Sequence, residues 1–347
     1  MKKIGVWNYY EVFNTNNYLL LNKDAGIGDS LLEPFNQLYI KGKHNNIDFM
    51  TLDLIDNFND MDGFIFFDFP RMTNRYVKKV FQTDLPKYLV VLESKLIRID
   101  NWNVKKCVSF KRVFTWSDDI ENGKKYIKLN LSQKIIKDIT KDITKDIFKK
   151  KKLCTLIAGN NKINHPLELY SKRVEVIKWF EKNHPEDFDF YGVDWDRYVS
   201  SNKYIRYLFK ITGLSKIFKP NYPSYKGKID SKKDTLEKYK FSICYENARD
   251  IPGYITEKIF DCFFAGCVPI YWGANNITDH IPKECFIDKR DFEDYKSLYD
   301  YLIGLSNDKY LEYIDAIENY LKSKEVYKFS TENFANTIVQ IISDDIN

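Results

Sequence analysis

The chain has 347 residues, more than a single hydrophobic core usually holds, so two domains are expected. Hydrophobic residues make up 44% of the sequence, aromatic residues 16% and charged residues 30%, a composition that excludes a disordered protein. The net charge of +5 comes from 54 basic and 49 acidic residues. This near balance excludes a dedicated polyanion binder, and no nucleic-acid partner is expected. A slight positive excess favours an anionic small ligand such as a nucleoside diphosphate.

The first residues read MKKIGVWNYYEVF, and Asn8 and Glu11 interrupt the apolar run. That run is too short for a signal peptide or a transmembrane segment, so we expect a cytoplasmic protein. Six cysteines lie in apolar contexts without CxxC or Cys/His metal spacing: Cys107, Cys154, Cys244, Cys262, Cys267 and Cys285. We interpret them as reduced core residues.

The first part of the chain carries three short apolar runs flanked by turn or charged residues, at 3–7, 63–69 and 88–92. This pattern is typical of buried parallel strands and predicts an α/β domain over 1–150. Between 131 and 152, isoleucines recur every four residues in tandem KDIT units, which predicts a helix with a narrow apolar stripe. A solvated helix or helical linker at a domain boundary is favoured over a functional repeat.

After this boundary the pattern β, α, β resumes with LCTLIA at 153–158, a helix over 168–183 and DFDFYG at 187–192. The stretch 200–225 is basic and aromatic without a clean period, and we interpret it as an irregular excursion. Beyond residue 291 the sequence is mainly helical. These features predict a second α/β domain over 151–310 and a helical tail over 311–347 that returns across the first domain.

Residues 239–273 predict strand, loop, helix and strand in turn, with KFSICYEN and CVPIYWG as the strands. Thr256 is a suitable N-cap for the helix, and Gly266 is suited to end it. The helix start then lies at the carboxyl edge of a parallel sheet, where its free N–H groups and dipole favour a phosphate. Lys258 adds a positive charge, and the Glu257 carboxylate can accept hydrogen bonds from sugar hydroxyls. A sugar nucleotide fits both, although an ordinary solvent-facing Glu-Lys pair is the simpler alternative.

The strings CYEN and GYITEKIFDCFFAGCVPIYWG resemble the donor-binding signature of the α1,3-fucosyltransferase family. The resemblance implies a GT-B type α/β fold, with two Rossmann-like domains facing across a cleft, an acceptor-side N-terminal domain and a C-terminal domain that binds GDP-fucose. It implies that Asn247, Tyr254, Glu257 and Lys258 contact the donor. A basic residue that some members carry falls on Pro166 here, so Arg173 or Lys162 is expected to make the second phosphate contact.

Inverting transfer needs a general base for the acceptor hydroxyl and a cation for the departing GDP. Glu93 follows the predicted strand at 88–92 and, with Ser94, resembles the base motif of the family, in which Lys95 here replaces a proline. Glu93 and Lys258 are therefore the predicted catalytic residues. A strand-end surface glutamate is the alternative for Glu93.

Several further side chains are expected at the same edge of the first domain and predict an acceptor pocket: Trp7, Asn8, Tyr10, Asp68 and Arg71. The resemblance implies an oligosaccharide or glycan acceptor, specifically a lactosamine-type glycan containing N-acetylglucosamine, with α1,3 as the expected linkage and α1,4, or both, as the alternatives. A GT-B enzyme for another nucleotide sugar is the first alternative. A lectin-like or nucleic-acid-binding module built on 203–228 is the second.

No metal site is predicted. The four histidines, His44, His165, His184 and His280, are scattered in polar settings, and the Asp194-Trp195-Asp196 triplet fits a loop better than a cation site. We expect that no cofactor is required and that a divalent cation at most stimulates the reaction.

Overall fold

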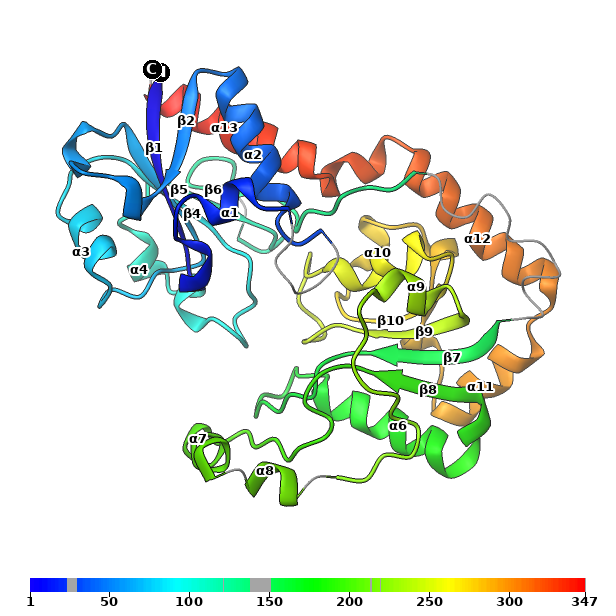
Figure 1. Cartoon of the computed structure of the whole chain (residues 1–347). Helices are drawn as coiled ribbons and strands as arrows, with labels where there is room; N and C mark the ends of the chain where they lie inside the picture. Colours follow the sequence, from blue (N-terminus) through cyan, green and yellow to red (C-terminus); the bar gives the residue numbers. More distant parts are fainter. Residues whose placement is uncertain (24–29, 121, 138–150, 213, 219, 347) are drawn as a thin grey trace. The chain divides into compact units, whose positions relative to one another are not determined.

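The computed structural model describes residues 1–23, 30–120, 122–137, 151–212, 214–218 and 220–346. The chain divides into two compact units (Figure 1). Unit 1 comprises Met1–Ile135, Pro252–Tyr254 and Lys324–Asn347, and unit 2 comprises Ile136–Ile251 and Ile255–Ser323. Two α/β units were the expectation from the sequence.

Unit 1 is built on a six-stranded sheet in the order β2-β1-β3-β4-β5-β6, and all its strand pairs are parallel. The strands are β1 Lys2–Asn8, β2 Ile47–Thr51, β3 Gly63–Phe67, β4 Lys87–Val90, β5 Arg112–Thr115 and β6 Tyr126–Lys128. The three predicted strands are confirmed as β1, β3 and β4. Every residue of β3 is buried, as expected for a central strand covered on both faces.

Alternate residues of these strands enter two separate cores. Ile65 and Phe67 of β3 join one core with α1 (Tyr18–Leu21), α2 (Glu33–His44) and α13 (Thr331–Ile346). Phe64 and Phe66 join the other, which includes α3 (Arg75–Phe81) and α4 (Val104–Cys107). The period of two along the strand thus supplies both faces of the sheet with apolar side chains.

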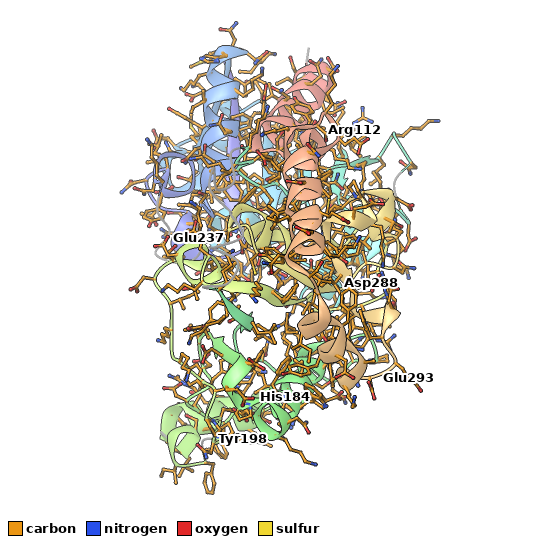
Figure 2. The ribbon with its side chains drawn as sticks, turned by 90° about the vertical axis from the view of Figure 1, so that its right-hand side faces the viewer. Arg112, His184, Tyr198, Glu237, Asp288 and Glu293 are labelled. Carbon is orange, nitrogen blue, oxygen red and sulfur yellow. The ribbon has the colours of Figure 1, made fainter. Side chains whose placement is uncertain are left out.

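The C-terminal helix α13 belongs to unit 1. It packs beside α2 (Figure 1), with Phe334 against Phe35 and Phe67. The Arg112 guanidinium also donates to both carboxylate oxygens of Asp345, at 3.0 and 2.7 Å, and Arg112 lies beside α13 in Figure 2. The expected return of the tail is confirmed, but α12 (Asn307–Lys322) lies in unit 2, so the tail is divided between the units.

Unit 2 contains a five-stranded parallel sheet in the order β11-β10-β9-β7-β8. Its strands are β7 Lys152–Ile157, β8 Phe188–Tyr191, β9 Tyr239–Tyr245, β10 Val268–Trp272 and β11 Ile287–Asp288. Its remaining helices are α6 Tyr170–Asn183, α7 Lys203–Thr212, α8 Leu214–Ile217, α9 Lys232–Leu236, α10 Glu257–Phe264 and α11 Tyr295–Gly304. The predicted strands and helix at 153–192 are confirmed.

Two sequence interpretations are corrected or left open. The stretch 200–225 is not irregular throughout, because it forms α7 and α8. Most of the predicted KDIT helix lies at 138–150, outside the described residues. Before it, Gln133 is extended and forms a parallel bridge to Ser330, so a helix does not begin at residue 131. All six cysteines are buried, as expected, and the structure has no disulfide among them.

Candidate functional site

The segment from β9 to β10 folds as predicted. Thr256 caps α10 through its hydroxyl, which accepts from the Lys258 N–H. Gly266, with φ of +55°, follows the helix in the left-handed region that favours glycine. Because β9 and β10 are parallel neighbours, the start of α10 lies at the carboxyl edge of this sheet.

The N-cap is held in place by Glu246, a residue that the sequence analysis missed. Its carboxylate is fully buried and accepts hydrogen bonds from the Thr256 N–H at 2.8 Å and the Thr256 hydroxyl at 2.7 Å. The Lys258 ammonium lies 3.4 Å from the same carboxylate. Burial raises the pKa of Glu246, and the charge of Lys258 opposes that rise. The sequence feature that could have identified Glu246 is a glutamate directly after a predicted buried strand, in the string CYEN.

Lys258 and Glu257 lie close together at the first turn of α10, with the Lys258 ammonium 3.3 Å from the Glu257 carboxylate. Burial works against the charge on each of them. The opposite charges outweigh burial in both cases. Lys258 and Lys232 lower the pKa of Glu257. Glu257 and Glu246 raise the pKa of Lys258. Both groups are therefore ionised near neutral pH, and the Glu257 side chain remains 45% exposed.

A second ion pair supports this turn from the side. The ammonium of Lys232, which comes from α9, lies 2.6 Å from the Asp261 carboxylate and 3.8 Å from that of Glu257. Burial, aided by the charge of Glu257 and opposed by Lys232, raises the pKa of Asp261 to about 7. The start of α10 is thus a built, charged cluster and not a pair of isolated solvent-facing side chains.

Arg173, on α6, is buried at 3% exposure. Its guanidinium donates to the carbonyl oxygens of Tyr245 and Glu246 at 2.7 and 2.9 Å, and to Asn247 Oδ1 at 3.0 Å. These bonds hold the carboxyl end of β9 and orient the Asn247 side chain. Arg173 therefore positions the end of β9 and Asn247, and the phosphate contact expected of it stays a prediction.

Arg249 is a second cation that the sequence analysis missed. Its guanidinium donates to the Pro166 carbonyl at 3.3 Å, and its backbone N–H donates to the Leu167 carbonyl at 2.8 Å. The Arg249 charge therefore lies beside the position at which the expected basic residue is replaced by proline. It also pairs with Asp250. Lys162, the other expected substitute, is exposed in the loop after β7.

Tyr254 lies in the part of the chain that clusters with unit 1. Its ring is buried and packs against Trp116, with the ring centroids 4.8 Å apart. The preceding Gly253 has φ of +77°, and a Cβ there would come within 2.4 Å of the Trp116 carbonyl oxygen. Glycine is thus required for this close approach. The structure places Tyr254 with unit 1, whereas Asn247, Glu257 and Lys258 belong to unit 2.

In unit 1, Glu93 follows β4 as predicted and is partly exposed. Its backbone is fixed on both sides. The Glu93 N–H donates to Asp68 Oδ1 at 3.1 Å, and the Glu93 carbonyl accepts from the Trp102 indole N–H at 3.1 Å. The pKa of Tyr10 is raised to about 12, mainly by partial burial and further by the negative charges of Glu93 and Asp68.

Asp68 and Trp7 do not line a surface, contrary to the expectation of an acceptor pocket. Asp68 is buried with φ of +62°, and its Oδ1 accepts from the Leu92 N–H at 2.8 Å and from the Asn101 side-chain amide at 2.7 Å. Burial raises the pKa of Asp68 against these hydrogen bonds. Trp7 is buried in the core, beside Tyr76.

The other predicted acceptor residues differ in accessibility. Asn8 is buried and its backbone N–H donates to Asn14. Arg71 is exposed and donates to the Tyr9 hydroxyl at 3.0 Å, while its guanidinium lies over the Tyr9 ring at 4.9 Å. Tyr10 is 48% exposed, so about half of its side chain is reachable although part of it is buried. Arg71 and Tyr10 are therefore the members of the set that a ligand can reach.

Among the described residues, His184, Glu186 and Asp187 are grouped closely enough to hold a metal ion. They lie just before β8, at the amino end of its sheet, away from the start of α10. His184 stacks on Tyr299 at 3.7 Å, and the Tyr299 hydroxyl donates to Asp187 at 2.6 Å. Asp194 and Asp196 both pair with Arg197. His184, Asp187, Asp194 and Asp196 thus each have a partner within the protein.

Comparison with known proteins gives consistent matches. The family model described as glycosyltransferase family 10 (fucosyltransferase), C-terminal part, matches residues 147–342, more than half of the chain. An α-(1,3)-fucosyltransferase of Helicobacter pylori is 32% identical over 108 residues, which are 31% of this chain and 22% of that protein. The 4-galactosyl-N-acetylglucosaminide 3-α-L-fucosyltransferase 9 of Mus musculus is 35% identical over 85 residues, 23% of each. The matched segments thus span less than a quarter of these relatives' length.

Solved structures extend the likeness to the fold of the whole chain. A crystal structure of an α1,3-fucosyltransferase matches with a TM-score of 0.52 at 16% identity, over 99% of this chain and 90% of that one. Anabaena HepE in complex with UDP-glucose matches with a TM-score of 0.57 at 8% identity, over 99% and 100%. These matches confirm the predicted GT-B type fold. No helix among the described residues is both long and apolar enough to span a membrane.

Proposed function

Because this chain belongs to glycosyltransferase family 10, the fucosyltransferases, we propose that it transfers L-fucose from GDP-fucose to a hydroxyl of a lactosamine-type glycan containing N-acetylglucosamine. The proposed reaction forms an α1,3 linkage with inversion. The observation that carries the proposal is the charged cluster at the start of α10, in which Glu246 and Thr256 hold Lys258 at a sheet's carboxyl edge. One structural relative was solved with GDP-fucose, and the mouse relative is named for a galactosyl-N-acetylglucosaminide acceptor.

Unit 2 is the proposed donor-binding unit. The N–H groups at the start of α10 and the ammonium of Lys258 present positive charge to a diphosphate. Burial disfavours the charge of Lys258, but the neighbouring carboxylates of Glu257 and Glu246 outweigh it and raise the pKa, so Lys258 stays charged at neutral pH. As the bond between fucose and GDP breaks, negative charge grows on the leaving phosphate, so a fixed ammonium stabilises the transition state more than the ground state.

Glu257 is proposed to bind hydroxyl groups of the donor. It is the carboxylate of the cluster with a large exposed fraction, whereas Glu246 is fully buried. An ionised carboxylate can accept hydrogen bonds from two neighbouring hydroxyls. Asn247, oriented by Arg173, and Tyr254 are the further proposed donor contacts.

We propose that Arg249 makes the second diphosphate contact and that Arg173 supports it indirectly. One guanidinium nitrogen of Arg173, Nη2, donates to two buried carbonyl oxygens and to the partly buried amide oxygen of Asn247. Arg249 is only partly buried, follows β9 in the same loop as Asn247, and carries a guanidinium that can bind a phosphate through two N–H groups.

Unit 1 is the proposed acceptor-side unit, with Glu93 as the general base. In the proposed step, the acceptor oxygen attacks the anomeric carbon of fucose while its proton passes to the Glu93 carboxylate. The bond between the anomeric carbon and the phosphate oxygen breaks, and its electron pair leaves with GDP. Hydrogen bonds to the backbone N–H and carbonyl of Glu93 favour this role, because a base must be held within hydrogen-bond reach of the proton. No cofactor is part of this proposal, and the cytoplasm is the proposed location.

The test is formation of product. The protein is incubated with N-acetyllactosamine and GDP-fucose, or with UDP-glucose or GDP-mannose in place of GDP-fucose, and products are identified by mass and NMR. We expect a fucosylated product from GDP-fucose alone, and its loss in Glu93→Gln with GDP-fucose binding retained. If product forms only from another nucleotide sugar, GDP-fucose is not the donor, although the GT-B type fold still stands.

A further inference from the structure

The segment around α7 and α8 has an unusual composition that the proposed reaction does not use. From residue 197 to 229 the sequence carries eight basic residues and no Asp or Glu: Arg197, Lys203, Arg206, Lys210, Lys216, Lys219, Lys226 and Lys228. Over the whole chain, basic and acidic residues are nearly balanced at 54 and 49. Arg197 and Lys226 form ion pairs with carboxylates outside this stretch. The other six basic residues, which include those of α7 and α8, still make this stretch strongly positive in sequence.

The same segment presents large apolar side chains to solvent. On α7, Tyr207 is 66% exposed and Ile211 is 61% exposed, and their spacing of four places them on one face of the helix. On α8 and just after it, Ile217 is 72% exposed and Phe218 is 61% exposed. In an ordinary amphipathic helix of a globular protein this apolar stripe faces the core. On α7 the apolar stripe faces solvent instead of the core.

Contacts within the segment hold this arrangement. Phe209 lies between Tyr198 and Phe218, with ring centroids 5.3 and 6.1 Å apart, and the Tyr198 N–H donates to the Ser215 carbonyl at 2.7 Å. The Arg206 guanidinium donates to the Ser200 carbonyl at 2.8 Å. Within unit 2, α7 and α8 extend beyond α6 at the β8 end of the sheet (Figure 1), where Figure 2 labels Tyr198. Contacts within the segment thus hold the helices that carry the exposed apolar side chains.

We propose that the exposed face of α7 and α8 is a docking surface for an anionic lipid bilayer. A helix with apolar and aromatic residues on one face and many Lys or Arg residues lies in a membrane interface, where the apolar side chains leave water and the cations meet anionic headgroups. Charge complementarity selects an anionic surface. The exposed isoleucines select lipid over a polynucleotide, because contacts with phosphates do not require aliphatic side chains.

Docking of this kind brings unit 2 to a surface without a transmembrane segment. The surface is independent of the proposed donor site, since none of its residues belongs to the cluster at the start of α10.

The test uses the full-length protein and sedimentation with large unilamellar vesicles. One set contains phosphatidylcholine alone, and the other contains phosphatidylcholine with phosphatidylglycerol. We expect binding to the anionic vesicles that weakens at high salt and little binding to the neutral ones. The double variant Ile211→Ser/Ile217→Ser should lower the partition coefficient by about tenfold or more, because two large apolar side chains are lost from the interface.

The matched control is Ile303→Ser, which replaces a 55% exposed isoleucine on α11 and should bind vesicles like the wild type. Because all three isoleucines are exposed, both variants should keep the wild-type melting temperature and GDP-fucose turnover with a soluble acceptor. The proposal is overturned if the wild type ignores anionic vesicles, or if the double variant binds them equally well. It is also overturned if the face instead mediates polynucleotide binding or concentration-dependent dimerisation without vesicle binding.

Discussion

The carboxylate of Glu246 accepts two hydrogen bonds from Thr256, one from its backbone N–H at 2.8 Å and one from its hydroxyl at 2.7 Å. Through this contact the end of β9 fixes the first turn of α10. The proposed phosphate-binding groups are thereby held in place before a ligand arrives, so little binding energy is needed to order them.

Replacement of Glu246 should therefore affect both stability and turnover. Glu246→Ala leaves a buried N–H and hydroxyl without their acceptor, so we expect a loss of about 1–3 kcal/mol in the free energy of unfolding. Turnover should fall further than stability explains, because Lys258 loses a neighbour that orients it. Thermal unfolding and steady-state kinetics with GDP-fucose measure the two effects. Glu246→Gln should recover more stability than turnover, and an alanine variant with wild-type kcat/KM would contradict this role.

Arg249 and Arg173 should respond differently to alanine substitution. Arg249→Ala is expected to weaken GDP binding by about tenfold or more with little change in melting temperature, because it removes one charged contact from a partly exposed site. Arg173→Ala should lower the melting temperature markedly, since it leaves two buried carbonyl oxygens without their donor. Calorimetric titration with GDP and thermal unfolding separate the two. Equal GDP affinity in Arg249→Ala and wild type would reject the second contact.

Asp68 should act on the reaction through the Glu93 backbone. Asp68→Ala removes the acceptor of the Leu92 and Glu93 N–H groups, so kcat should fall while the dissociation constant for GDP-fucose stays unchanged. Asp68→Asn keeps an oxygen for these bonds and should recover part of kcat. The exposed Asp60 offers a matched control, and Asp60→Ala should have wild-type kinetics. A parallel loss of donor affinity in Asp68→Ala would indicate general damage instead of positioning.

The Arg112–Asp345 pair should give a stability that depends on pH. Burial works against ionisation of Asp345, but Arg112 and Lys111 lower its pKa below the usual value. A carboxyl whose pKa is lower in the folded state stabilises the protein above its unfolded pKa, and this contribution is lost as the pH falls through the folded pKa. Asp345→Asn should thus cost about 1–3 kcal/mol at pH 7, and less below about pH 4. Chemical denaturation across pH measures this. A difference that does not depend on pH would contradict the assignment.

The sequence predicts the long buried strands well, because β1, β3 and β9 are continuous apolar runs that periodicity identifies without tertiary information. It does not predict β6 and β11, which have only three and two residues and pair at sheet edges. Such strands are set by their neighbours and not by their own composition. The same holds for α7, whose apolar side chains face solvent.

For the site, the sequence predicts that Thr256, Glu257 and Lys258 lie at the start of α10, since a strand, a cap and a helix follow one another within one short segment. It does not predict that Glu246 and Lys232 join them. It does not predict contacts between segments distant along the chain. Arg173 reaches the end of β9 across more than seventy positions, and Asp68 reaches the loop of Glu93 across twenty-five. Such contacts decide whether a charged side chain can bind a ligand or forms hydrogen bonds inside the protein.

The most direct test of the central claim is release of GDP from GDP-fucose in the presence of N-acetyllactosamine, compared among the wild type, Lys258→Ala and the nearby exposed control Lys233→Ala. We predict release that depends on the acceptor, a loss of about a hundredfold in kcat/KM for Lys258→Ala, and wild-type rates for Lys233→Ala. Near-normal turnover by a folded Lys258→Ala protein would contradict the assignment of the donor site to the start of α10.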